Sequence, residues 1–436
     1  MISSKFKFSD GKVWQASFAQ VFSRILALIS NFAIIAILAR TLSASDFGAW
    51  AVLVNIFQII LALDLGLGGA LRNKVSDHVL RNEEDTVRLY ATSLFLFLLI
   101  LLIIIIGAGS FMDLSESVGL GDKYHNSLVH AVIAGAFIVP AGMLGQLLYC
   151  YLEGVWIAYV EALRSIVVIA SIYLAVAFDF SFSSILSIYF FVFLTFYILL
   201  VGIFLYKRRW NLFRSIAQHS FNKFIVNIKE LIAPAWLLSL MQIASMISGN
   251  VSTIMVGKYL SLEEAGEFSA VFRLYSSATG LHLAFLMPFW GAFALKHAEL
   301  DYPWIKRMVV LLTTVTFTLC ALFSLSMFYY GYLVVNIWTS LSITDSSLYF
   351  YSSVWMTLTM IATIYGIYLN ATGQYLIQTF AQVASAIFIV LTTKYFSANY
   401  GVNGVIFSLI AGAFIVCSLN IAAYKVYINR KSAAIY

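Results

Sequence analysis

The sequence predicts an all-α polytopic membrane protein with about 12 transmembrane helices, in two six-helix lobes related by a parallel pseudo-two-fold repeat. Three observations predict this fold class. Hydrophobic residues make up 62% of the 436 residues and charged residues only 11%, whereas an ordinary soluble domain carries roughly 25% charged residues. The chain contains about a dozen apolar stretches near the roughly 20 residues that a spanning helix needs. A motif from the first half recurs in the second half.

The predicted spans follow one another with short connections. The first is too long for the core of a signal peptide, and it ends at Arg40 rather than at a small-residue cleavage site. An even number of spans places both termini on the same side of the membrane. The predicted spans are 17–39, 47–71, 89–110, 127–150, 160–178, 185–206, 231–256, 266–293, 305–329, 349–371, 376–396 and 402–425.

The distribution of Lys and Arg predicts which side holds the termini. If the N-terminus is cytoplasmic, only Arg40, Lys123, Lys258 and Lys394 lie outside, and Arg24 and Arg273 lie within spans. The other 20 of the 26 basic side chains (26 − 4 − 2) then lie inside. This excess predicts a multi-pass membrane protein with both termini in the cytoplasm. The net charge of +6 is therefore a topology signal and does not predict a nucleic-acid partner.

The repeated motif occupies residues 40–50 and 258–268, an offset of 218 residues in a chain of 436 (258 − 40). Leu, Ser and Gly are identical, and basic, acidic and aromatic positions match in kind. Each copy follows the first span of its half. A duplicated membrane half is typical of transporters. The predicted division is an N-terminal lobe at 1–206, a C-terminal lobe at 231–436 and a basic amphipathic cytoplasmic helix at 207–230 that joins them.

Ionisable side chains inside spans are costly and usually indicate function. Arg24 and Asp64 both lie about 10 Å inside the inner ends of spans 1 and 2, so they can pair. One interpretation is a buried ion pair that holds the two spans together. The other is that Asp64 takes a proton or Na⁺ while Arg24 competes for the carboxylate.

Arg273 and His282 are the other two ionisable candidates. Arg273 lies in the outer half of span 8, where a planar guanidinium suits phosphate oxygens, so we expect an anionic ligand there. The alternative is that it snorkels to the surface or pairs with backbone carbonyls. His282 aligns with Asp64 in the repeat. It is either a second proton-linked group or a neutral histidine satisfied by a neighbouring helix.

Amide and aromatic side chains accompany these charges. Asn31, Asn55, Asn250 and Tyr275 lie in spans and are candidate contacts for a diphosphate or a sugar. The alternative is that they hydrogen-bond neighbouring helices, since such bonds hold spans together. A separate pattern on the last span, Gly404, Ser408 and Gly412, predicts a face of small residues that packs against another helix.

No motif predicts an enzyme, a metal site or a cofactor. Cys150, Cys320 and Cys417 are far apart and lack metal-ligand spacing. The chain contains no phosphate-binding loop of the Gly-Lys-Ser/Thr type and no HExxH or GxSxG motif. We therefore expect a transporter without ATPase activity of its own.

Residues 38–50 and Leu63-Asp64-Leu65-Gly66-Leu67 resemble the Wzx-type O-antigen and oligosaccharide flippases, the polysaccharide transporter family of the MATE-like MOP superfamily. The resemblance implies two lobes around a cationic cavity, to which Arg24 and Arg273 would contribute. It implies that the cargo is a polyprenyl-diphosphate-linked O-antigen repeat unit. The protein would flip this cargo to the periplasmic leaflet of the membrane by alternating access, with membrane lipid around it. H⁺ or Na⁺ would drive the cycle, and a polymerase and a chain-length regulator would be partners in assembly.

Two other functions stay open. A multidrug or cation antiporter of the same superfamily would need acidic residues in its cavity, and the balance of Arg24 and Arg273 against Asp64 favours an anionic cargo. An O-antigen polymerase or ligase, which is a membrane enzyme, would carry large outside loops with catalytic Arg or His. The outside loops predicted here are short.

Overall fold

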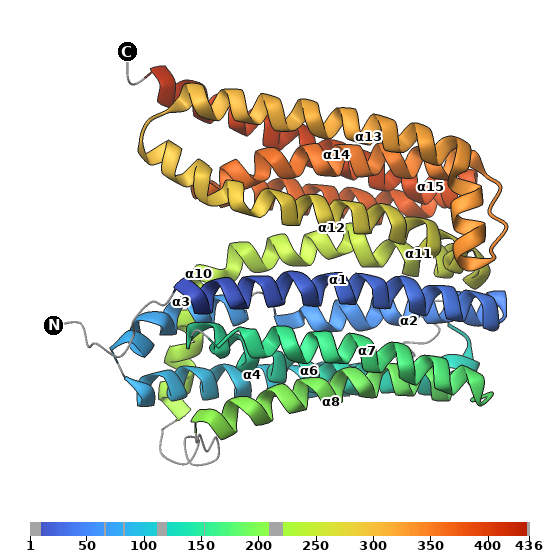
Figure 1. Ribbon diagram of the computed structural model, residues 1–436, viewed down its shortest axis with the longest axis horizontal. Coiled ribbons are helices and arrows are strands. Elements are labelled where there is room, and N and C mark those ends of the chain that lie inside the picture. Colours follow the sequence, from blue (N-terminus) through green and yellow to red (C-terminus); the bar gives the residue numbers. More distant parts are fainter. Residues whose placement is uncertain are drawn as a thin grey trace. The chain divides into compact units, whose positions relative to one another are not determined.

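The computed structural model describes residues 10–64, 67–81, 83–110, 120–151, 153–208 and 221–433 (Figure 1). Within these ranges the regular structure is entirely helical, as the sequence predicts. The chain divides into two units, which are described separately. Unit 1 comprises Met1–Thr41 and Ile56–Ser239, and unit 2 comprises Leu42–Asn55 and Leu240–Tyr436. Helix α2 therefore contributes to both units.

The helices follow one another in the order α1 (Asp10–Thr41), α2 (Ala44–Leu61), η1 (Ala62–Asp64), α3 (Leu67–Leu80), α4 (Glu84–Ser110), η2 (Asp122–Tyr124), α6 (His125–Cys150), α7 (Val155–Ala177), α8 (Phe182–Arg208), α10 (Phe221–Met246), η3 (Ile247–Val251), α11 (Ser252–Tyr259), α12 (Leu262–Ala298), α13 (Tyr302–Thr339), α14 (Ser346–Ala371) and α15 (Tyr375–Ala433).

The described helices agree with the predicted number of spans. Ten of them are long and apolar enough to cross a membrane, and α12, bent by 40° between Met287 and Ala292, brings the number to eleven. α15 has 59 residues, too many for one span of roughly 20 residues, and Gly401 interrupts its helical backbone. Counting the two parts of α15 separately gives twelve spans, which confirms the prediction.

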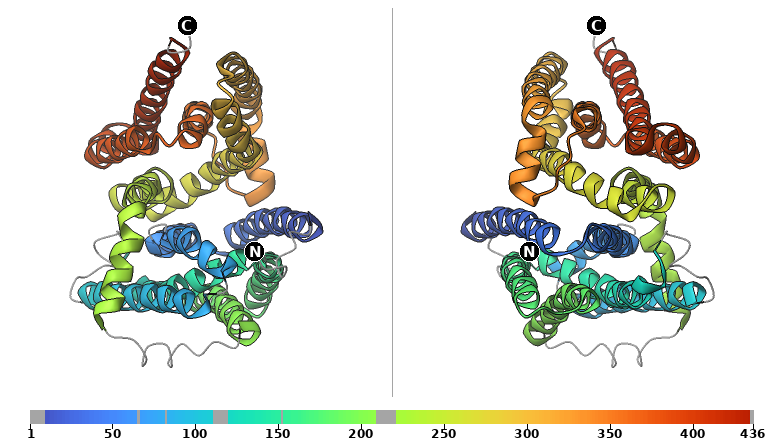
Figure 2. Two further views of the ribbon diagram at one scale, coloured as in Figure 1. Left: turned by 90° about the vertical axis from the view of Figure 1, so that its left-hand side faces the viewer. Right: turned by 90° about the vertical axis from the view of Figure 1, so that its right-hand side faces the viewer.

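Unit 1 is a bundle whose helices are seen nearly end-on in Figure 2. α1 packs against α7, and α6 packs against α3, α4 and α8. Apolar side chains from these helices form one buried core, which includes Leu94, Leu144, Leu147 and Phe204. The last turns of α2 join this bundle through Phe57, whose ring lies against Phe190 of α8 with a centroid separation of 4.9 Å.

The predicted linker helix at 207–230 is only partly described, because residues 209–220 lie outside the described ranges. Residues 221–230 form the first turns of α10, and contacts in unit 1 anchor them. Glu230 accepts a hydrogen bond from Tyr90 at 2.5 Å and pairs with Lys74 at 2.9 Å. These two partners lower the pKa of Glu230. The same hydrogen bond from Lys74 to Glu230 raises the pKa of Lys74.

Unit 2 is centred on α14, which packs against α12, α13 and α15. The predicted small-residue face on the last span is confirmed, because it packs against the first half of α15. Thr392 donates to Ser408 at 3.2 Å. A Cβ atom at Gly412 would lie 2.6 Å from the Ser385 hydroxyl, and one at Gly404 would overlap the Phe396 carbonyl oxygen. The two halves of α15 therefore approach closely at Gly404 and Gly412, where a larger side chain would not fit.

The repeated motif forms equivalent helix starts. The Ser43 hydroxyl accepts a hydrogen bond from the Asp46 N–H at 3.1 Å and donates to its carboxylate at 2.9 Å. Ser261, 218 residues later (261 − 43), forms the same pair of bonds with Glu264, at 3.1 and 2.8 Å. Each serine satisfies a backbone donor that the first turn leaves unpaired. The repeat in the sequence is thus a repeated cap on α2 and α12.

Replacing Ser261 with alanine should lower the stability of the protein by about 1 kcal/mol, since the Glu264 N–H loses its acceptor. Thermal unfolding of the purified protein in detergent measures the effect. Ser326→Ala is the matched control, because Ser326 is exposed on α13 and donates only to Leu322 of its own helix. Equal midpoints for the two variants would contradict the capping role.

Candidate functional site

The predicted Arg24–Asp64 pair falls in unit 1, and the structure places only one of its side chains. Arg24 is exposed on α1. Asp64 ends the short helix η1, and its side chain lies outside the described residues. The pairing, and the role of Asp64 as a coupling group, stay predictions.

Arg273 and Asn250 lie in unit 2, and both side chains are half-buried. Arg273 is 11 residues from the start of α12 (273 − 262), roughly 16 Å along the helix. Asn250 lies in η3, a π-helical segment that separates α10 from α11. Such segments within helices frequently occur at functional sites. The interruption of span 7 at Asn250 is therefore consistent with a ligand site, and the sequence did not predict it.

Two of the predicted ligand contacts are structural in this conformation. Tyr275 is fully buried, its hydroxyl donates to the Tyr349 carbonyl at 2.8 Å, and Ser353 donates to that hydroxyl at 3.4 Å. Asn55 is also buried, and its amide donates to the Ala51 carbonyl at 2.8 Å. Both side chains are thus engaged within the protein in this conformation, and their role as ligand contacts stays a prediction. Asn31, by contrast, is exposed on α1.

His282 contacts a neighbouring helix through only one of its two ring nitrogens. Its Nε2 lies 3.0 Å from the Thr316 hydroxyl of α13, so a neighbouring helix engages it as expected of a packed histidine. Its Nδ1 is buried and has no hydrogen-bond partner among the described residues. The ring is therefore half satisfied, and its role in ion coupling stays a prediction.

The structure reveals two charged residues that the sequence reasoning did not select, Glu161 and Arg164. The predicted span began at residue 160, which put Arg164 at the inner boundary and counted it among the cytoplasmic basic residues. Helix α7 instead begins at Val155 and is one continuous candidate span to Ala177. Glu161 and Arg164 are therefore about 9 and 14 Å inside the helix. The signal that could have found them is Glu153-Gly154, a helix-breaking glycine just before the apolar run.

Glu161 and Arg164 line a pocket of about 150 Å³ in unit 1, here called the α7 pocket. Apolar side chains form most of its wall, and Tyr197 and two glycines complete it. α6, α7 and α8 supply nearly all of these residues. The lining residues are Leu61, Ile138, Val139, Gly142, Met143, Gly145, Ile157, Val160, Glu161, Arg164, Phe196, Tyr197 and Leu200.

Two aromatic rings of α8 hold the Arg164 guanidinium. Its central carbon lies 4.4 Å from the Phe193 ring centroid and 5.8 Å from that of Tyr197. A guanidinium stacked on a ring keeps the N–H donors at its edge available. Both Arg164 and Glu161 are half-buried and fully described, and no ion pair joins them. The pocket thus presents a positive and a negative group side by side at membrane depth.

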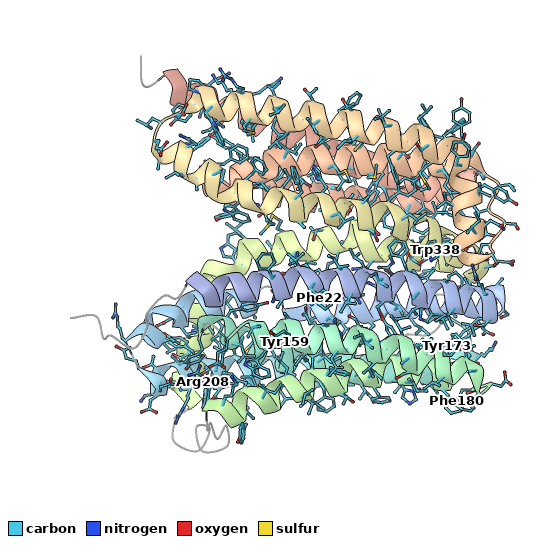
Figure 3. All side chains as sticks on the ribbon, viewed as in Figure 1. Phe22, Tyr159, Tyr173, Phe180, Arg208 and Trp338 are labelled. Carbon is cyan, nitrogen blue, oxygen red and sulfur yellow. The ribbon has the colours of Figure 1, made fainter. Side chains whose placement is uncertain are left out.

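Aromatic side chains lie on the outside of unit 1, and Figure 3 labels several of them. Phe22 of α1 and Tyr173 of α7 are exposed, as expected of side chains that face lipid. At one end of the bundle, Arg208 pairs with Glu153 at 2.8 Å and lies 3.6 Å from the Tyr151 ring centroid. This ionic cluster lies at helix ends, where charge is readily solvated.

Metal ligation was not predicted, and the described part of the chain contains no group of three or more His, Cys, Asp or Glu side chains that could hold a metal ion.

Comparisons with known proteins identify the fold. An inward-facing multidrug resistance MATE transporter of the MOP superfamily superposes with a TM-score of 0.67 at 13% identity, over 93% of this chain and 96% of that one. The lipid II flippase MurJ in an inward closed conformation gives 0.67 at 15% identity, over 96% and 90%. The Vibrio cholerae MATE transporter VcmN gives 0.60 at 13% identity, over 97% and 98%. At these identities the likeness establishes the fold alone.

The sequence comparison identifies the family. No match was found among curated proteins. Residues 13–289, more than half of the chain, match the family model described as polysaccharide biosynthesis protein. The resemblance noted in the sequence is therefore confirmed at the level of family and superfamily fold, and the chain belongs to the polysaccharide biosynthesis protein family.

Proposed function

We propose that the protein is a flippase that moves a polyprenyl-diphosphate-linked O-antigen or similar surface-polysaccharide repeat unit from the cytoplasmic to the periplasmic leaflet. The cycle is one of alternating access in the bacterial inner membrane, coupled to an H⁺ or Na⁺ gradient. Membrane lipid surrounds the protein, and a polymerase and chain-length regulator receive its product. A sugar diphosphate cannot cross hydrocarbon unaided, because desolvating its charges and hydroxyls is too costly.

The observation that carries this proposal is the combination of family and fold. The family model links the chain to polysaccharide biosynthesis, while its fold is shared with MATE transporters and with a flippase for another lipid-linked saccharide. A transporter that serves polysaccharide biosynthesis carries a precursor across the membrane. That precursor has a lipid tail, which stays in the bilayer, and a polar head, which needs a polar path.

The half-buried Arg273 is the residue to which we assign the diphosphate. Its guanidinium offers planar donors that match phosphate oxygens in pairs, and Arg273 is half-buried in the candidate span α12. Asn250, in the interrupted span 7, and Arg24 are secondary contacts. Asp64 and His282 remain the assigned coupling groups.

A cation antiporter is the second candidate. The observation that favours it is Glu161, a carboxylate that lines a pocket in a spanning helix. A cationic drug would be attracted to that carboxylate but repelled by the adjacent Arg164.

Replacing Arg273 with alanine in the proposed flippase should abolish surface polysaccharide, whereas Arg273→Lys should retain part of it, because lysine keeps the charge and loses the paired donors. A deletion strain complemented with each variant would be scored for its long-chain polysaccharide ladder. Arg307→Ala is the matched control, since Arg307 is exposed near the start of α13.

The location of the lipid-linked units in the same strains distinguishes the functions. Intact units trapped on the cytoplasmic leaflet of the deletion strain would support the flippase. Units that already face the periplasm would instead indicate a polymerase or ligase step. An unchanged polysaccharide ladder in the deletion strain would favour the antiporter. A normal ladder in Arg273→Ala, at normal protein level, would refute the assignment of the diphosphate to Arg273.

A further inference from the structure

The α7 pocket combines two groups of opposite hydrogen-bonding character. Carboxylate oxygens of Glu161 only accept hydrogen bonds, and guanidinium nitrogens of Arg164 only donate them. The two residues are three positions apart on α7 and so face the same side of the helix, yet no ion pair joins these two described side chains. The contact of Arg164 with Phe193 directs the guanidinium to α8. Each charged group is thus left for a third partner.

The position of the two charges within a candidate span favours such a partner. Ionic side chains in a spanning helix are costly and usually pair with another group or face a water-filled cavity. Cation–π contact offsets part of that cost for Arg164. The recorded hydrogen bond at Glu161 is made by its backbone carbonyl, which accepts from Ser165 at 2.9 Å, and not by its carboxylate. A ligand or water that fills the pocket would satisfy both groups.

The chemistry of the pair selects among ligands. A phosphate would pair with Arg164 but would be repelled by Glu161. An ammonium group would pair with Glu161 but would be repelled by Arg164. A sugar ring satisfies both, because each hydroxyl donates to a carboxylate and accepts from a guanidinium. The apolar wall and the aromatic ring of Tyr197, which also lines the pocket, suit the C–H faces of such a ring.

The size of the pocket admits a sugar ring. Its volume of about 150 Å³ is roughly ten times the about 10–15 Å³ that a single water molecule needs on the same measure. Two glycines of α6 maintain this space. A Cβ atom at Gly142 would lie 3.3 Å from the Tyr197 ring, and one at Gly145 would lie 2.7 Å from Leu200.

We propose that the α7 pocket is a sugar subsite, in which Glu161 accepts from and Arg164 donates to the hydroxyls of one ring of the transported saccharide. This inference rests on the proposed function and adds to it. Arg273 binds the diphosphate that every such cargo shares, and the α7 pocket reads the sugar that distinguishes one cargo from another. Selectivity of this kind is strong, because a cargo without the matching hydroxyls leaves buried polar groups unpaired.

The test measures binding of two probes to the purified full-length protein in lipid nanodiscs. One probe is sugarless polyprenyl diphosphate, and the other is the lipid-linked repeat unit extracted from the deletion strain. Wild type should bind the glycosylated lipid at least tenfold more tightly. Glu161→Gln and Arg164→Gln should each lose most of that preference while keeping the affinity for the sugarless lipid within about twofold. Arg273→Ala should weaken both probes alike.

A steric variant keeps the test independent of charge. Gly142→Leu should remove the same preference by filling the pocket, and Gly202→Leu should not, since nothing lies within 4 Å of a Cβ atom at Gly202. Thermal unfolding of each variant checks that it is folded. The sugar subsite alone would be overturned if Glu161→Gln and Arg164→Gln still bound the glycosylated lipid more tightly than the sugarless one. It would also be overturned if these variants lost the same factor of affinity for both lipids. Failure of wild type to bind either lipid would overturn the proposed function with it.

Discussion

Gly48→Ala should destabilise the protein by about 1–3 kcal/mol or more and abolish surface polysaccharide, because the added methyl group has no space. A Cβ atom at Gly48 would overlap the backbone carbonyl of Leu262, the first residue of α12. Backbone at a helix start that is fixed by the Ser261 cap cannot rotate away as a side chain can. The start of α12 would have to move away from α2.

The repeat provides a graded comparison for this prediction. Gly266 is the equivalent of Gly48 in the second half (48 + 218), and it lies at the same crossing. A Cβ atom there would lie 2.8 Å from the Phe47 ring, which can move, and 3.2 Å from the Gly48 nitrogen. Gly266→Ala should therefore have a smaller effect than Gly48→Ala, and Gly202→Ala should have none. The folded yield, the thermal midpoint and the polysaccharide ladder are measured for all three variants. If the three variants behaved alike, the close approach of α2 and α12 at Gly48 and Gly266 would be contradicted.

This crossing also explains why a repeat of so few identical residues is readable in the sequence. Ser43 and Ser261 cap their helices, Asp46 and Glu264 complete the caps, and Gly48 and Gly266 allow the close approach. The serine and glycine identities each correspond to a requirement of backbone geometry that few residue types meet. Neighbouring positions such as Ser45/Glu263 and Ala49/Glu267 differ between the two copies.

The fold was predictable because the length and apolarity of a span are sequence properties, and the twelve spans follow from them. Which face of a span a residue occupies was not predictable. In a soluble helix the buried face is the apolar one, but a spanning helix is apolar on its lipid face and on its packed face. The sequence therefore could not distinguish Tyr275 and Asn55, which are buried, from Asn31, which is exposed.

The α7 pocket was missed for a related reason. A hydropathy window places Arg164 at the edge of a span, since charge near a boundary is read as the boundary itself. The actual helix begins earlier, at Val155, where Gly154 ends the preceding turn. Only the packing of α6, α7 and α8 shows that Glu161 and Arg164 line one pocket. Side chains from three helices that meet in space leave no pattern in a single sequence.

The kink in α15 gives the second large expected effect. Gly401 has φ of 57° and ψ of −140°, a conformation that is essentially restricted to glycine. No atom lies within 4 Å of a Cβ atom there, so Gly401→Ala tests backbone conformation without a clash. It should destabilise the protein by about 1–3 kcal/mol.

Gly404→Ala tests the close approach that follows this kink. Its Cβ atom would overlap the Phe396 carbonyl oxygen and lie 2.9 Å from the Ser397 nitrogen, so both contacts are with backbone and neither can relax by a rotamer change. We expect Gly404→Ala to lose about 1–3 kcal/mol of stability. The double variant with Gly401→Ala should lose less than the sum of the two single losses, because both changes open the same turn.

Thermal unfolding in detergent provides the values, with Gly280→Ala as the control. Gly280 is helical, exposed and has nothing within 4 Å of its Cβ position, so alanine there should be neutral or slightly stabilising. Additive losses would mean that the kink and the close approach are independent, and the second half of α15 would then owe its position to the Gly412 contacts instead.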